Sequence, residues 1–155
     1  MGNDEAGNEI LGNDAYVLLS NLYWQTLAIL RLDKTNYMLE LNHKKMQAWS
    51  LGMELLVQIY TLASLLPTSE KYNLVSQMQR AALSITNNIA EGAARKSVAE
   101  RRRFYEVARS SSVEVDNCFE VILKMKWADE STITAISRIN ESVFKLLSKM
   151  MNSEH

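Results

Sequence analysis

The chain has 155 residues, of which 47% are apolar and 23% charged, with one Pro and five Gly. This composition excludes a disordered protein and indicates a single helical, globular domain. The net charge of −1 excludes a global positive field, so any attraction to nucleic acid must be local. The single Cys118 excludes an intramolecular disulfide and suits a reducing cytoplasm.

The first 36 residues differ in composition from the rest of the chain. Residues 1–13 are rich in Gly, Asn and acidic residues, and we expect a flexible N-terminus there. Residues 14–36 are predicted to form an extra N-terminal helix, capped by Asp14, followed by a break. The run from Ala15 to Leu32 is apolar on most sides, which favours burial or a partner. Polar residues interrupt this run, so we expect no membrane span.

Residues 37–155 are predicted to fold as an all-α, antiparallel up-down four-helix bundle. The first predicted helix begins at about residue 37 or 41 and ends at 66, and the others cover about 69–93, 97–127 and 129–150. In each helix, the residues expected to face the core recur in steps of three and four, which is the spacing of a bundle seam. The predicted seams are Trp49, Met53, Leu56, Tyr60 and Ala63; Val75, Met78, Ala82, Ile85 and Ile89; Phe104, Ala108, Ser111, Val115, Cys118, Ile122 and Met125; and Ile133, Ile136, Asn140, Val143, Leu147 and Met150.

The ends of these helices are indicated by capping residues and breakers. Pro67 ends the first helix of the bundle, because the residue before a proline is pushed out of the helical region. Gly92 is predicted to end the second helix. Ser97 and Glu100 have the spacing of a capping box at the start of the third helix. Asp129 and Ser131 can each cap the fourth.

The second helix of the bundle carries a polar stripe opposite its apolar face: Gln77, Arg80, Ser84, Asn87, Asn88 and Glu91. Amide and hydroxyl groups suit shape-specific hydrogen bonding, so the stripe predicts a subunit interface or a network between helices. A solvated face and a ligand site are the alternatives. Arg80 is expected to pair with Glu114 or Glu106, and Glu91 with Arg109.

A basic patch follows the polar stripe: Arg95, Lys96, Arg101, Arg102, Arg103 and Arg109. Between residues 70 and 110 there are eight Lys or Arg against four Glu, whereas residues 1–42 are acidic. Consecutive arginines fan over about 200° of a helix, so all three cannot serve one flat surface. The patch is interpreted either as solvated charges and salt bridges or as a contact with the phosphate backbone. Beyond Tyr105, few aromatic residues lie among these cations, so the sequence gives little support for stacking on bases.

Residue patterns for catalysis are nearly absent. Glu40 and His43 match one Glu-x-x-His motif, but a di-iron site in a bundle needs two such motifs and two further Glu. The other histidine is His155, and neither a Gly-rich phosphate loop nor a Cys cluster is present. We therefore expect no enzyme activity, no metal and no cofactor. Cys118 is interpreted as an inert core residue, and the Ser110–Ser112 run as small residues for close packing.

An ordered string of residues resembles a known family. It comprises Trp49-Ser-Leu-Gly-Met53-Glu54-Leu55, Ile59-Tyr60, Leu66-Pro67, Glu70-Lys-Tyr72, Gln77-Met-Gln-Arg80-Ala81-Ala82, Ser84-Ile85, Asn88-Ile89-Ala90-Glu91-Gly92, Arg95, Ala108-Arg109-Ser110-Ser111 and Glu114. The string resembles bacterial four-helix-bundle proteins encoded in intervening sequences of large-subunit ribosomal RNA genes. The resemblance covers about residues 41–150; residues 1–40 lie outside it.

The resemblance implies a ring-shaped homopentamer. A more distant relative is the accessory protein of diversity-generating retroelements, a pentamer that binds nucleic acid and a reverse transcriptase. The expected function is therefore a non-enzymatic, cytoplasmic scaffold or accessory protein that contacts RNA or DNA through the basic patch. The alternative is a module for protein–protein assembly with no nucleic-acid role.

Overall fold

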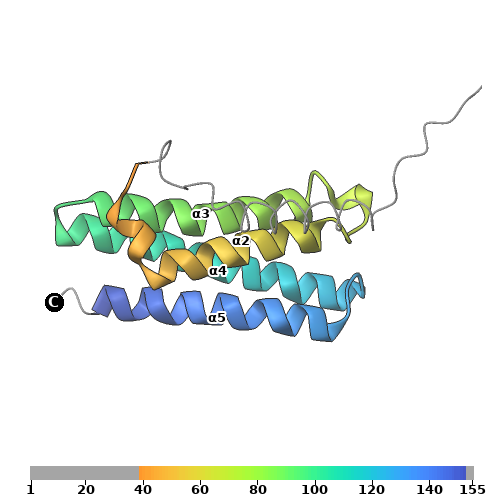
Figure 1. Cartoon of the computed structure of the whole chain (residues 1–155). Coiled ribbons are helices and arrows are strands. Elements are labelled where there is room, and N and C mark those ends of the chain that lie inside the picture. Colours follow the sequence, from red (N-terminus) through yellow and green to blue (C-terminus); the bar gives the residue numbers. More distant parts are fainter. Residues whose placement is uncertain (1–38, 153–155) are drawn as a thin grey trace, which may run out of the picture. The chain divides into compact units, whose positions relative to one another are not determined.

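Four α-helices, each antiparallel to the next, dominate residues 39–152, the part of the chain that the computed structural model describes (Figure 1). They are α2 (Gln47–Ala63), α3 (Leu74–Ala94), α4 (Val98–Met125) and α5 (Glu130–Asn152). Two short 3-10 helices, η1 (Asn42–Lys45) and η2 (Thr68–Glu70), precede α2 and α3. Residues 39–152 contain no strand, and the predicted all-α up-down bundle is confirmed. The predicted N-terminal helix and flexible segment lie outside the described residues.

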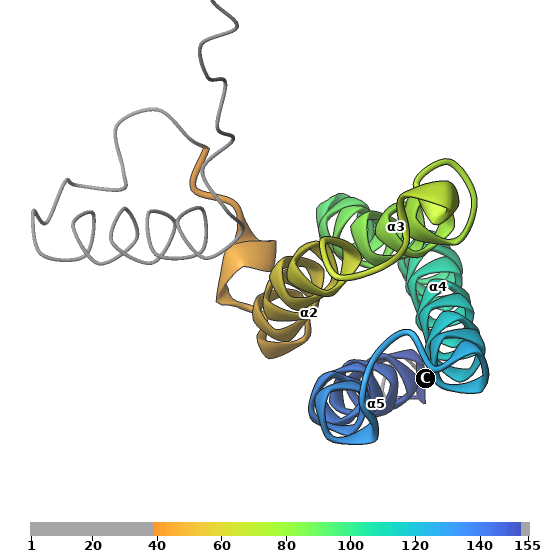
Figure 2. The same cartoon turned by 90° about the vertical axis from the view of Figure 1, so that its right-hand side faces the viewer.

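The four helices close into a ring around one core. α2 packs against α3, α3 against α4, α4 against α5, and α5 returns to α2, with the most extensive contact between α3 and α4. Figure 2 shows this ring nearly end-on. Since neighbours run in opposite directions, the start of α2, the end of α3, the start of α4 and the end of α5 share one end of the bundle (Figure 1).

The core-facing side of α2 differs from the prediction by one residue. The buried positions are Ala48, Gly52, Leu55, Ile59 and Leu62, each one residue before a predicted seam position. The predicted seam lies at the edge of the core, and its Tyr60 is 52% exposed. The reason is the close contact of Gly52 with side chains of α3: a Cβ added to Gly52 would lie 3.2 Å from Cγ2 of Thr86. Gly52 therefore allows α2 to approach α3 closely, and the helix buries the face on which this glycine lies.

The predicted seams of α3, α4 and α5 are confirmed at most positions. All five seam residues of α3 are buried, as are Ala108 to Ile122 of the α4 seam and Ile133 to Leu147 of the α5 seam. Phe104 and Met150 are half-buried, and Met125 is exposed because α4 ends there. The α4 core also includes Tyr105, Ser112 and Phe119, which the seam spacing did not predict.

Gly92 does not end α3, so that prediction is wrong. The helix continues to Ala94, and Gly92 is buried within its last turn. A Cβ added at this position would lie 2.6 Å from Cε1 of Tyr105 and 3.2 Å from Cβ of Phe104. Gly92 is therefore required for the close approach of α3 and α4, because a side chain would collide with a buried ring.

Of the predicted capping residues, Asp129 forms a cap and Ser97 does not. Ser97 precedes α4 as predicted, but its side chain makes no capping hydrogen bond, so the capping box is not formed. Asp129 does cap α5: its Oδ1 accepts a hydrogen bond of 2.8 Å from the backbone N–H of Thr132. Between these, α4 ends at Lys126 in the left-handed conformation, with φ 57°. The N–H of Trp127 donates to the carbonyl of Ile122 at 3.1 Å, as is typical of this helix end.

Candidate nucleic-acid interface

The turn between α3 and α4 holds much of the predicted basic patch, and Arg95 is anchored within it. Its guanidinium forms an ion pair with Glu91 one turn earlier on α3. The same group lies over the ring of Phe104, with Cζ 5.0 Å from the ring centroid, within the range of a cation–π contact. The predicted pairing of Glu91 with Arg109 is wrong, because Arg95 is close enough on the same helix to take its place.

Arg101 ties the start of α4 to the end of α3. Its Nη1 donates hydrogen bonds to the carbonyl oxygens of Arg95, at 3.2 Å, and Lys96, at 3.0 Å. These carbonyls come at the end of α3, where backbone acceptors lack partners within the helix. The positive charge of Arg101 also lies at the negative end of the helix dipole. Arg101 therefore stabilises the turn.

Arg109 is directed toward α5. Its Cζ lies 5.4 Å from the centroid of the Phe144 ring, and its Nε is buried with no hydrogen-bond partner among the described residues. The residue is half-buried and lies two turns along α4 from the first arginines of the patch. The structure thus divides the six predicted residues into three anchored ones, Arg95, Arg101 and Arg109, and three exposed ones, Lys96, Arg102 and Arg103.

The three exposed residues share their end of the bundle with other cations. The antiparallel order brings Lys44 and Lys45 of η1 and Lys149 of α5 to the same end (Figure 1). We call these six exposed side chains the basic end: Lys44, Lys45, Lys96, Arg102, Arg103 and Lys149. None of them forms an ion pair with another residue between 39 and 152. Their charges are therefore not compensated by ion pairs within the described residues.

The polar stripe of α3 is divided between the protein interior and its surface. Ser84 and Asn88 are half-buried: Asn88 Nδ2 donates to the carbonyl of Ser84 at 2.8 Å and to its Oγ at 3.1 Å. Ser111 of α4 donates to Ser84 Oγ at 2.9 Å. These bonds link α3 and α4 at this part of the stripe. Gln77, Arg80, Asn87 and Glu91 are exposed, and Arg80 forms no ion pair with a described residue, so its predicted pairing with Glu114 or Glu106 is wrong.

A second link between helices was not predicted. Ser112 Oγ donates to Asn140 Oδ1 at 2.6 Å, and Asn140 Nδ2 donates back to the carbonyl of Ser112 at 3.0 Å. Both residues are buried, so each group supplies the partner that the other lacks. The available signal was Asn140 itself, because an amide on an apolar seam requires a partner from a facing helix.

Two pockets lie between neighbouring helices. One, of about 370 Å³, lies between α3 and α4 and is lined by Asn88, Arg95, Glu100, Arg103, Phe104 and Val107. It contains two cations of the predicted patch and the amide of the polar stripe. The other, of about 390 Å³, lies between α4 and α5 and is lined by Ser112, Val113, Asp116, Ser137, Asn140, Glu141 and Phe144. Its titratable residues are acidic.

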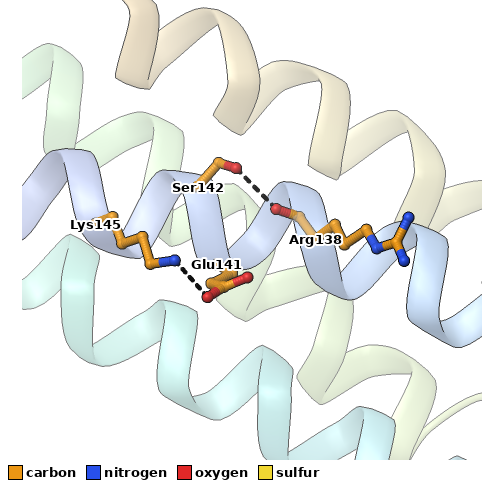
Figure 3. Close-up of polar contacts among 4 residues, drawn as sticks. All are labelled: Arg138, Glu141, Ser142 and Lys145. Carbon is orange, nitrogen blue, oxygen red and sulfur yellow. Dashed lines mark hydrogen bonds and ion pairs between the residues drawn. The ribbon is translucent and has the colours of Figure 1, made fainter.

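Two further cations of α5, Arg138 and Lys145, do not belong to the basic end. Lys145 donates to Glu141 Oε1 at 2.5 Å, so its charge is compensated on the same helix (Figure 3). Ser142 Oγ donates to the carbonyl oxygen of Arg138 at 2.9 Å, while the guanidinium of Arg138 takes no part in that bond (Figure 3). Arg138 is exposed and lies toward the opposite end of the bundle, which makes it a suitable control position.

No group of three or more His, Cys, Asp and Glu within residues 39–152 could hold a metal ion. The His43 ring instead lies edge-on to Trp49, with centroids 5.2 Å apart. Cys118 is buried in the core, and this burial and the nearby Glu114 raise the pKa of its thiol, which favours the neutral form. Among the helices of residues 39–152, none has the length and apolar character of a membrane span.

Comparisons with known proteins agree with the fold and the motifs. A search of curated proteins gave no match. Among solved structures, a protein of unknown function from the S23 ribosomal protein family of Bacteroides thetaiotaomicron VPI-5482 matches with a TM-score of 0.63 and 21% identity. The match covers 68% of this chain and 95% of that one. The family described as 23S rRNA-intervening sequence protein matches residues 44–149. The chain therefore belongs to the 23S rRNA-intervening sequence protein family.

Proposed function

We propose that the protein is a non-enzymatic, oligomeric scaffold whose basic end contacts the phosphate backbone of structured RNA. The observation that carries the proposal is the basic end itself. Six exposed cations come from three separate parts of the chain, and their charges are not compensated by ion pairs with described residues. Phosphate contacts are made by such side chains and need no base-specific geometry.

Three arginines of the predicted patch are held by contacts within the protein, so the exposed cations are the ones expected to contact RNA. Arg101 and Arg95 hold the α3–α4 turn through carbonyl contacts and the ion pair with Glu91. Arg109 is stacked on Phe144. The predicted nucleic-acid role therefore falls mainly to Lys96, Arg102 and Arg103, with Lys44, Lys45 and Lys149 as additional contacts.

Assembly would strengthen this contact. In a homo-oligomer, such as the homopentamer that the resemblance implies, the basic end would be repeated and the fields of the copies would add. The exposed polar residues of α3, Gln77, Arg80, Asn87 and Glu91, suit an interface.

A second candidate function is a protein assembly module with no nucleic-acid role. It is favoured by the apolar side chains that α2 leaves outside the core, among which Val57 is 59% and Tyr60 52% exposed. Exposed apolar patches of this kind mark protein interfaces.

Light scattering after size exclusion, with and without a structured RNA at low and moderate salt, separates the two functions. The proposed function predicts a multiple of the subunit mass and a further increase with RNA at low salt. Arg102→Glu with Arg103→Glu should abolish that increase. Lys124→Glu with Arg138→Glu makes the same charge change at the opposite end and should preserve it. An oligomer whose mass ignores RNA at low salt would favour the assembly module, and a monomer would contradict both.

A further inference from the structure

The pocket between α3 and α4 has a composition that simple phosphate binding does not require. We propose that it receives one unpaired nucleobase of the RNA that the basic end contacts. The inference rests on the proposed function and deepens it, because it adds selection for unpaired nucleotides to a contact that is otherwise independent of sequence.

Two of the lining residues, Arg95 and Phe104, offer a stacking surface. Both are half-buried. The Arg95 guanidinium is already placed over the Phe104 ring, with Cζ 5.0 Å from the centroid, and its ion pair with Glu91 restrains it. Unstacked bases bind to aromatic rings and to the planes of guanidinium groups. A base on Arg95 would extend a stack that the protein has formed in advance.

The remaining lining residues supply hydrogen-bond acceptors and a cation. Asn88 Nδ2 is used by Ser84, while its Oδ1 accepts no hydrogen bond from the described residues. Glu100 is exposed and contributes a carboxylate. Acceptors of this kind match the N–H groups on the edges of bases, whereas a carboxylate would repel a phosphate. Arg103 is exposed and also belongs to the basic end, so it can bind the adjoining phosphate.

The size and position of the pocket fit this ligand. Its volume of about 370 Å³ lies within the usual range for small-molecule sites. It lies beside the α3–α4 turn, next to the exposed cations. The corresponding pocket between α4 and α5 presents Asp116 and Glu141 instead, and it has no residue of the basic end. An RNA backbone on the basic end can therefore place a base in the first pocket.

The test compares three RNA hairpins of the same stem sequence: one fully paired, one with a single bulged nucleotide, and one with an abasic residue at the bulge. Affinities are measured by fluorescence anisotropy with the full chain at one salt concentration. The pocket predicts that the bulged hairpin binds about tenfold more tightly than the paired one. The abasic bulge keeps the backbone and its phosphate, and it should lose this preference.

Phe104→Leu adds a protein-side test, since leucine keeps the apolar contact but removes the ring. The ratio of the bulged to the paired affinity should fall toward one. Equal binding of all three hairpins by the wild-type protein would overturn the nucleobase pocket and leave the phosphate contact standing. No binding of any hairpin at low salt would instead overturn the proposed function. If the hairpins bind equally and Phe104→Leu lowers the oligomer mass, the pocket belongs to a contact between copies.

Discussion

Gly92 of α3 lies directly against the buried ring of Tyr105 on α4, so closely that a Cβ on the glycine would lie 2.6 Å from Cε1 of the ring. Tyr105 is 3% exposed and belongs to the core, so its ring cannot move away from an added Cβ without disturbing its neighbours. This contact fixes the separation of the two helices beside the α3–α4 turn, and the turn in turn positions Lys96, Arg102 and Arg103.

Gly92→Ala is therefore expected to lower the free energy of unfolding by about 1–3 kcal/mol, the usual cost of overpacking a core. Urea unfolding followed by circular dichroism measures this change. Gly52→Ala is the matched control, because its added Cβ would lie 3.2 Å from the nearest atom and should cost less. In a Tyr105→Leu background, the cost of Gly92→Ala should shrink. Equal stability of Gly92→Ala and the wild type would contradict this account.

The buried pair Ser112–Asn140 is expected to be strongly coupled. Ser112→Ala leaves Asn140 Oδ1 without its donor and should cost about 1–3 kcal/mol. Asn140→Leu in the same chain removes the stranded amide, so the double variant should be more stable than the sum of the single changes implies. A double-mutant cycle measures this coupling by urea unfolding. Additive single changes would show that the two residues do not depend on each other.

Acid unfolding should reveal the cap of α5. Hydrogen bonds from Ser131 and from the backbone and side chain of Thr132 hold the pKa of Asp129 well below its ordinary value. The folded protein thus favours the ionised carboxylate, whose stabilisation is complete above about pH 4 and is lost as the pH falls toward the lowered pKa. The stability difference between the wild type and Asp129→Ala should shrink over this acidic range. Asp129→Asn is the control, because it keeps a capping oxygen without a titrating group. If the stability difference between the wild type and Asp129→Ala did not change with pH below 4, the assignment would be contradicted.

Lys126→Gly is expected to stabilise the protein. Lys126 ends α4 at φ 57°, a conformation that costs an L-residue roughly 1–2 kcal/mol and that glycine adopts freely. After the greater entropy of glycine in the unfolded chain is subtracted, a gain of up to about 1 kcal/mol remains. Thermal and urea unfolding measure it. Lys124→Gly, within the last turn of the same helix, should instead destabilise by about 1 kcal/mol. A loss of stability in both variants would argue against strain at Lys126.

Much of the bundle was predictable because α3, α4 and α5 each have one apolar face. The spacing of the apolar residues alone therefore identifies the face that packs in the core. α2 has two adjacent apolar stripes that differ by one residue. Choosing between them required knowing that Gly52 approaches Thr86, which is a property of two helices together. Gly92 was misassigned for the same reason. In sequence, a glycine near a helix end indicates a cap, whereas here the missing side chain makes room for the ring of Tyr105 on the facing helix.

The candidate site was predictable only as a set of residues. Clustering of Arg and Lys in the sequence identified the basic patch, but the sequence did not distinguish Arg101, which binds backbone carbonyls, from Arg102, which is exposed. Lys44, Lys45 and Lys149 are far from the patch in sequence and reach its end of the bundle only through the antiparallel fold. The base-stacking surface was missed because Arg95 and Phe104 come together from different helices.

The salt dependence of RNA affinity tests the central claim most directly. The logarithm of the binding constant for a structured RNA is measured against the logarithm of the salt concentration, for the wild type, for Arg102→Gln with Arg103→Gln, and for Lys124→Gln with Arg138→Gln. If the basic end binds phosphate, removing two contacts should make the slope shallower by about 1.5, while the control pair retains the wild-type slope. An unchanged slope in the Arg102 and Arg103 variant would contradict the account.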